Sequence, residues 1–203
     1  MSPDLVIIGA GPAGMTAARI AAEVRKDIAA FLELHIEQGP VLETEKLDIG
    51  VVTAIAGITR IEIIVEGRAD HAGTTPMGNR ADALAAAARL VTDIEALAKS
   101  LSAGPAHFTA TVGEFSIEPN AANVVPSRAR LLIDARAEER TAMDVFAASV
   151  DQLAAEIARE TGTVIAAPRR ISDNMPTPGD PLVLDVLDAA CETAGASHRR
   201  IAS

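Results

Sequence analysis

Three ionisable side chains alternate along one apolar segment near the N-terminus. In residues 31–38 the sequence FLELHIEQ places Glu33, His35 and Glu37 on one side of an extended chain, with leucine and isoleucine on the other. A glycine–proline pair follows and ends the segment. The pattern predicts a β-strand whose polar face carries a histidine, and an imidazole in that place can ligate a divalent metal ion. The alternative is a half-exposed strand that binds no ligand.

Three more candidate residues lie in the middle of the chain. His71 lies in the loop sequence GRADHAGTTPM, among small residues that leave room for a ligand, although loop histidines are commonly just exposed. Asn123 lies in EPNAANVVP before a predicted strand, and Arg136 ends that strand in LLIDARAEE. A guanidinium group at a strand end can bind a carboxylate through two parallel hydrogen bonds. A surface network between Asp134 and Arg136 is the alternative.

A glycine loop opens the chain. Gly9, Gly11 and Gly14 follow the apolar run LVII with the spacing G-x-G-x-x-G, and an alanine-rich stretch comes next. This order predicts a strand, a tight turn and a helix whose first N–H groups a pyrophosphate could approach. Residues 3–22 resemble the start of an FAD- or NAD-dependent oxidoreductase. Because the remaining sequence lacks the further strands that such an enzyme needs, we do not expect FAD or NAD to bind.

The elements that position these residues alternate between strand and helix. Apolar residues every three or four positions predict two helices, one opened by Asn79 with Asp82 and one running from Thr141 to Gly162. Alternating segments rich in valine and isoleucine predict strands at 51–66, 106–117, 124–136 and 163–171. The order βαββαβ is typical of a ferredoxin-like fold of the α/β (α+β) class, with an antiparallel sheet and both helices on one face.

Composition limits the classes of partner. The 203 residues carry a formal net charge of -10, so nucleic acid and anionic membrane surfaces are not expected partners. Aromatic residues make up 2% of the chain, which also disfavours recognition by base stacking. The single cysteine, Cys191, excludes an internal disulfide and fits a reducing compartment. We therefore expect a soluble cytoplasmic protein.

Taken together, four motifs are far more specific than any one of them. ELHIEQGPVLE, VEGRADHAGTTPM, NAANVVP and DAR, in this order and spacing, closely resemble the amidohydrolases of the M20 metallopeptidase superfamily. The resemblance covers about residues 26–203 and is closest to N-carbamoyl-L-amino-acid hydrolases, allantoate amidohydrolases and ureidopropionases. It implies a hydrolase of non-peptide C–N bonds that acts on a small ureido or N-carbamoyl substrate with a carboxylate.

The resemblance also implies a role for each candidate residue. His35 corresponds to a ligand of one of two divalent metal ions, which could be zinc, manganese, cobalt or nickel. Gln38 corresponds to a substrate-contacting glutamine. His71 is the implied catalytic residue, which stabilises the oxyanion of the tetrahedral intermediate, while Asn123 orients that intermediate. Arg136 is implied to bind the substrate carboxylate.

A division of the chain follows from the same resemblance. Residues 45–172 correspond to a lid that forms a homodimer, while residues 1–44 and 173–203 correspond to a partial α/β catalytic-domain remnant. Most metal ligands of the family have no counterpart here, so we expect a truncated hybrid, joined near residues 20–27, that is inactive by itself. Two alternatives stay open, namely an FAD- or NAD-binding oxidoreductase fragment and a non-enzymatic dimerisation module.

Overall fold

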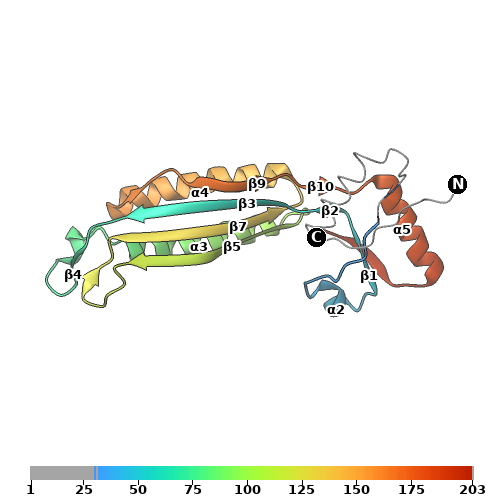
Figure 1. Cartoon of the computed structure of the whole chain (residues 1–203), viewed down its shortest axis with the longest axis horizontal. Coiled ribbons are helices and arrows are strands. Elements are labelled where there is room, and N and C mark those ends of the chain that lie inside the picture. The colour runs from blue at the N-terminus through green and yellow to red at the C-terminus, as the bar shows by residue number, and fades with distance from the viewer. Residues whose placement is uncertain (1–29, 31, 203) are drawn as a thin grey trace. The chain divides into compact units, whose positions relative to one another are not determined.

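The computed structural model describes residue 30 and residues 32–202, which form two compact units. The larger unit is Ala54–Pro178, and the smaller unit joins the described residues up to Thr53 with Gly179–Ile201. Helices and strands carry the labels of Figure 1. The predicted strand, glycine turn and helix that contain Gly9, Gly11 and Gly14 lie outside the described residues. The domain boundaries expected from the sequence stay a prediction.

An antiparallel sheet forms the body of the larger unit. Its order is β5 (Phe108–Glu118), β7 (Arg128–Ala137) and β3 (Gly57–Glu66), with β8 (Val164–Ile165) and β9 (Arg169–Asn174) sharing the outer edge of β3. β3 and β7 pair over ten positions, for example Ile61 with Ile133. The helices α3 (Ala83–Ser102) and α4 (Arg140–Thr161) both lie behind the sheet as it is viewed in Figure 1. The predicted βαββαβ fold is confirmed.

Strict alternation along the two central strands builds the core. Every second residue of β3 and β7 is buried against the helices, and the residues between them face the open side of the sheet. The largest fully buried side chains include Ile61, Ile63, Leu131, Ile133 and Phe146. Replacing one of the buried isoleucines with alanine costs about 2–5 kcal/mol, because the helices already fill the space around it.

The helix ends follow local side-chain chemistry. The Asp82 carboxylate accepts hydrogen bonds from the N–H groups of Leu84 and Ala85, so α3 begins at Ala83. The predicted opening at Asn79 is therefore wrong, since Asn79 ends a short 3-10 turn, Met77–Asn79. α4 ends as predicted, at a left-handed Gly162 with φ 67°.

The last predicted strand of the larger unit is divided in two. β8 and β9 replace the single strand expected at 163–171, and both pair with β3. Pro168 lies between them, and proline lacks the N–H that a continuous strand would have to donate.

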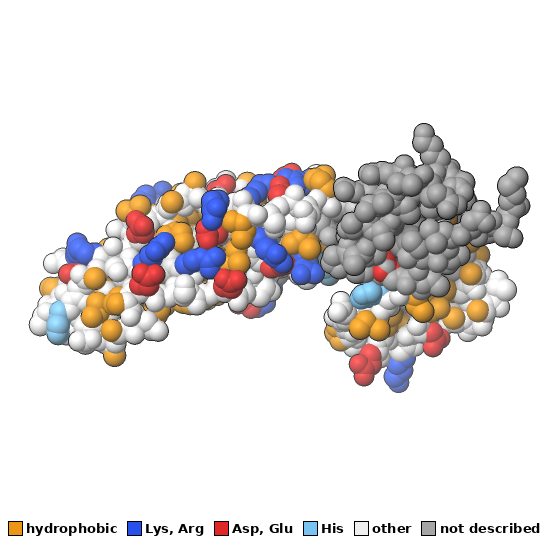
Figure 2. All heavy atoms as spheres, viewed as in Figure 1, with side chains coloured by type: hydrophobic (Ala, Val, Ile, Leu, Met, Phe, Trp, Pro, Cys, Tyr) orange, Lys and Arg blue, Asp and Glu red, His pale blue; other side chains and the backbone are white. Residues whose placement is uncertain are grey.

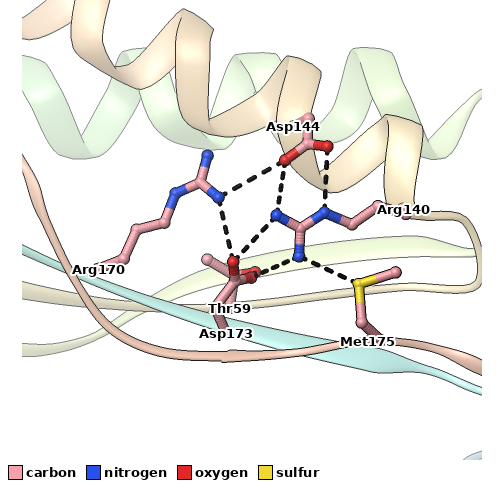
Figure 3. A network of polar contacts seen from close by, with 6 residues as sticks. All are labelled: Thr59, Arg140, Asp144, Arg170, Asp173 and Met175. Atoms are coloured by element: carbon pink, nitrogen blue, oxygen red, sulfur yellow. Dashed lines mark hydrogen bonds and ion pairs between the residues drawn. The ribbon is translucent and has the colours of Figure 1, made fainter.

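A polar network attaches β9 to the start of α4 (Figure 3). The Arg140 guanidinium donates to both carboxylate oxygens of Asp173, each at 2.9 Å, and also pairs with Asp144 at 2.9 Å. The hydroxyl of the buried Thr59 on β3 donates to Asp173 at 2.8 Å. Three elements thus meet at one carboxylate.

The smaller unit has its own parallel strand pair. β1 (Ile49–Val52) pairs in parallel with β11 (His198–Ile201), and the helix α5 (Pro181–Ala194) covers them. Asp180 caps α5 and a left-handed Gly195 ends it. A short helix, α2 (Val41–Glu45), precedes β1.

The strand predicted at residues 31–38 is wrong. Residues 32–37 have no regular structure, and the side chains of Leu34 and Ile36 are 79% and 74% exposed. Alternation selects a strand only where a neighbouring strand supplies hydrogen bonds and an apolar face to cover. No described strand forms a β-ladder with residues 32–37.

Two short strands mark the ends of the larger unit. β2 (Ala54–Ile55) pairs antiparallel with β10 (Thr177–Pro178). The chain therefore enters and leaves the larger unit at one place.

Candidate functional site

A two-stranded ribbon brings two of the candidate residues together. β4 (Asp70–His71) pairs antiparallel with β6 (Val124–Val125), and His71 lies opposite Val124. The N–H of Ala72 donates to the carbonyl of Asn123 at 3.0 Å. Figure 1 shows the ribbon beyond one end of the main sheet. His71 and Asn123, which are 52 positions apart in the sequence, are thus neighbours in space.

A hydrogen bond from the backbone sets which nitrogen of the neutral His71 ring carries the proton. The N–H of Gly73 donates to His71 Nδ1 at 3.1 Å, so Nδ1 acts as an acceptor. In the neutral ring the proton then sits on Nε2, which can donate to a ligand. The His71 side chain is exposed. A side chain at Gly73 would approach the ring, since a Cβ there would lie 3.2 Å from His71 Cε1.

Two residues that the sequence reasoning missed hold the His71 loop in place. Arg80 donates to the carbonyl oxygens of Ala72, at 2.7 Å, and Thr75, at 2.8 Å and 3.0 Å. Gly67 lies where the chain turns from β3 toward the ribbon, and a Cβ there would lie only 2.1 Å from the carbonyl oxygen of Ala81. The signals were a glycine after a strand and an arginine after a loop, and neither is specific by itself.

Arg136 lies far from the ribbon. It is near the end of β7 that pairs with Gly57 and Ile58, whereas the ribbon adjoins the other end, where Arg128 pairs with Glu66. Arg136 lies eight positions after Arg128, which at about 3.3 Å per position is roughly 26 Å. One copy of the larger unit therefore does not bring His71, Asn123 and Arg136 to one small molecule.

Asp134 holds Arg136 on the open face of the sheet, and Arg60 holds Asp134 in turn. Arg136 Nε donates to Asp134 Oδ1 at 2.9 Å, and Arg60 Nε donates to Asp134 Oδ2 at 3.0 Å. Partial burial opposes ionisation of Asp134, but the hydrogen bonds from Arg136 and Arg60 lower the pKa of its carboxyl group below the ordinary value. The ion pair that the sequence offered as an alternative is present, and it leaves Arg136 half exposed.

The described residues do not fit a two-metal centre. His35 is exposed, and its Nδ1 lies against the carbonyl of Ile36. The Glu37 carboxylate accepts hydrogen bonds from the N–H groups of Val41 and Leu42, at 2.7 Å and 2.9 Å. Within residues 30 and 32–202, no three His, Cys, Asp or Glu side chains gather where they could hold a metal ion. We therefore derive no step through a metal.

Gln38 is exposed and has a left-handed backbone, with φ 55°. It belongs to the smaller unit, as His35 does, while the other three candidates belong to the larger one. Among the helices that the structure describes, none has the length and apolar character needed to cross a membrane.

Comparison with known proteins identifies the larger unit. Residues 53–162 match the family model of the peptidase dimerisation domain of M20 proteins. Over 183 residues the chain is 37% identical to an N-carbamoyl-L-amino-acid amidohydrolase of Paenarthrobacter aurescens, covering 90% of this chain and 43% of the relative. Over 122 residues it is 43% identical to an allantoate amidohydrolase of Bacillus subtilis (strain 168), covering 60% of this chain and 29% of the relative.

A solved structure has the same fold. An amidase of the hydantoinase/carbamoylase family from Burkholderia multivorans superposes with a TM-score of 0.81 at 36% identity, covering 87% of this chain and 42% of that one. The chain thus spans less than half the length of these relatives. Since the family model covers more than half of the 203 residues, the chain belongs to the M20 family and carries its peptidase dimerisation domain.

Proposed function

We propose that the chain supplies the substrate-holding lid of a ureido amidohydrolase, an enzyme that hydrolyses the C–N bond of an N-carbamoyl amino acid or a similar compound. The neighbouring placement of His71 and Asn123 on one ribbon carries the proposal. His71 Nε2–H would donate to the oxyanion that forms on the ureido carbonyl, and Asn123 would orient it. Arg136 would bind the substrate carboxylate. The names of the relatives support this substrate class.

The separation of Arg136 from the ribbon requires a second copy of the chain. About 26 Å of strand lies between them, which no small ureido compound spans. A site that uses all three residues therefore takes His71 and Asn123 from one copy and Arg136 from another. The match to a dimerisation domain agrees with this requirement.

Strand β5 is the edge best suited to pair with that copy. It is one continuous strand of eleven residues with a register shift between Val112 and Glu114, and only Glu114 and Glu118 carry charge. The opposite edge is divided between two strands, and Arg169 and Arg170 begin β9. Short strands and charges protect an edge from pairing, whereas a long edge with few charges invites it.

Two-fold pairing of β5 with its copy would complete the site. A two-fold axis through the middle of the strand places the Glu118 end of one copy beside the Phe108 end of the other. Glu118 pairs with Arg128 near the ribbon, and Phe108 pairs with Ala137 beside Arg136. The partner's His71 would then lie at the end of the sheet where Arg136 is.

Sedimentation and calorimetric titration test the proposal. We expect the full chain to be a dimer that binds N-carbamoyl-L-alanine. We expect H71A and N123A each to weaken the Kd by about 2- to 10-fold, the effect of losing one hydrogen bond to the neutral ureido group of the unreacted substrate. A dimer that binds no N-carbamoyl-L-alanine would instead favour the non-enzymatic dimerisation module. A monomer would contradict both.

A further inference from the structure

Two guanidinium groups share one carboxylate on the open face of the sheet. Arg60 on β3 and Arg136 on β7 both bind Asp134, and each does so through Nε. No described residue accepts a hydrogen bond from the terminal Nη groups of either arginine. Two positive charges and one negative charge leave one positive charge in excess. The arginine and aspartate side chains are 47%, 52% and 31% exposed, so a solute can reach them.

A second charged cluster on this face, formed by Arg130, Arg169, Glu62 and Glu114, differs in each of these respects. Arg130 donates through Nε to Glu62 and through Nη1 to Glu114, each at 2.8 Å, and Arg169 also donates to Glu62. Its two arginines and two glutamates balance. Figure 2 shows basic and acidic side chains interleaved along this side of the larger unit. Of these two clusters of described side chains, the group of Arg60, Asp134 and Arg136 is the one that has both an excess positive charge and Nη groups without a hydrogen-bond acceptor.

Neutral residues flank this group in the sheet. Thr111 lies opposite Asp134 and Thr109 opposite Arg136 on β5, while Ser172 lies opposite Arg60 on β9. None of them is a carboxylate, so the neighbouring strands bring no further anion to these positions. An anion from outside the sheet therefore meets little competition there.

We propose that Arg60 and Arg136 bind the substrate carboxylate together and that Asp134 is the residue that positions them. By accepting from Nε of each arginine, Asp134 fixes both guanidinium planes and leaves their Nη edges for the ligand. One carboxylate balances the single excess charge, so the site favours a monocarboxylate. Because the proposal deepens the role proposed for Arg136, it rests on the proposed function.

Calorimetric titration of the full chain with two probes tests it. The probes are N-carbamoyl-L-alanine and its amide, which lacks the carboxylate. We expect the acid to bind at least about 10-fold more tightly than the amide, and R60Q and R136Q each to remove most of that preference. R60K keeps the charge but not the planar fork, so it should fall between R60Q and the unmodified chain. R130Q, on the same face, is the matched control and should leave the preference intact.

D134N separates positioning from charge balance. A positioning role predicts weaker binding of the acid, although the variant adds positive charge to the site. A pure counter-ion role predicts tighter binding and would overturn the role of Asp134. An effect of R136Q without one of R60Q would overturn the paired site but leave the proposed function standing. No effect of R136Q, or no binding by the unmodified chain, would overturn both. Urea unfolding of each variant checks that it folds.

Discussion

His71 and Arg136 lie at opposite ends of one antiparallel sheet. His71 pairs with Val124 in the ribbon beyond one end, and Arg136 pairs with Ile58 near the other end. The register of β3 with β7 fixes this separation, because neither strand can slip by one residue without exposing its buried face.

Mixing two weakly binding variants should restore tight binding if the site is shared between copies. H71A and R136Q homodimers each lack one half of both sites, whereas a mixed dimer has one intact site. After subunit exchange we expect N-carbamoyl-L-alanine to bind at about one quarter of the unmodified stoichiometry. Titration before and after mixing measures this. Mixed samples that bind no better than the separate variants would show that the site lies within one copy.

A charge on β5 should dissociate the dimer. Phe115 is a 44% exposed phenylalanine on the β5 edge, and F115K places a lysine in each copy where the two strands would pair. We expect a monomer by analytical ultracentrifugation. The matched control is I171K on β9, where Ile171 is 42% exposed on the opposite edge. If I171K dissociated the dimer and F115K did not, the interface would lie at the β9 edge and the proposed β5 interface would be wrong.

Removing the Arg80 side chain should loosen the His71 loop. R80A breaks the hydrogen bonds to the Ala72 and Thr75 carbonyls, so the loop loses its fixed geometry. We expect faster hydrogen exchange in residues 72–75 and about 10-fold weaker binding of N-carbamoyl-L-alanine. R159A removes a nearby exposed arginine on α4 and should change neither. If hydrogen exchange of residues 72–75 were the same in R80A as in the unmodified chain, the backbone hydrogen bonds alone would hold the loop.

Acid should weaken the attachment of β9 to α4. Hydrogen bonds from Arg140 lower the pKa of both Asp173 and Asp144 below the ordinary value of 3.8. Because the folded pKa is the lower one, their stabilisation is complete above the unfolded pKa and is lost as the pH falls through the folded pKa. D173N should therefore destabilise the chain at pH 7 and make its stability less dependent on pH between about 5 and 2.

Urea unfolding at several pH values measures this effect. D151N, which changes an exposed aspartate of α4, is the control. Equal pH dependence of D173N and the unmodified chain would show that the network does not contribute.

Hydrolysis should not accompany binding in this chain alone. His35 is the one metal ligand that the family resemblance implies in this chain, and a catalytic metal needs about three protein ligands, so we expect no ammonia release from N-carbamoyl-L-alanine with added manganese. An ammonia assay with a complete amidohydrolase as the positive control tests this. Turnover that H35A abolishes would prove the expectation wrong.

Sequence periodicity predicted the helices and strands that have one buried face and one exposed face. The alternation of Ile61 and Ile63 in β3 and the spacing of Leu90 and Ile94 in α3 each specify a buried side. Gly162, Gly195 and Asp180 mark helix ends by their own backbone and side-chain chemistry, and the structure has them there.

What depends on distant partners could not be predicted. The segment around His35 alternates like a strand, but alternation does not reveal whether a neighbouring strand exists. Conversely, HRRI of β11 has one apolar residue and forms a strand because β1 lies beside it. Arg80 was missed because its acceptors are loop carbonyls, which leave no mark in the sequence. His71 and Asn123 were recognised by motif, while their closeness required the ribbon.

The pairing of β2 with β10 gives the larger unit a property beyond its site. Its first and last residues lie side by side, so it can be spliced into a surface turn of another domain without disturbing that domain's chain path. The larger unit therefore has the geometry of an insertion domain, which can be inserted or exchanged as one piece.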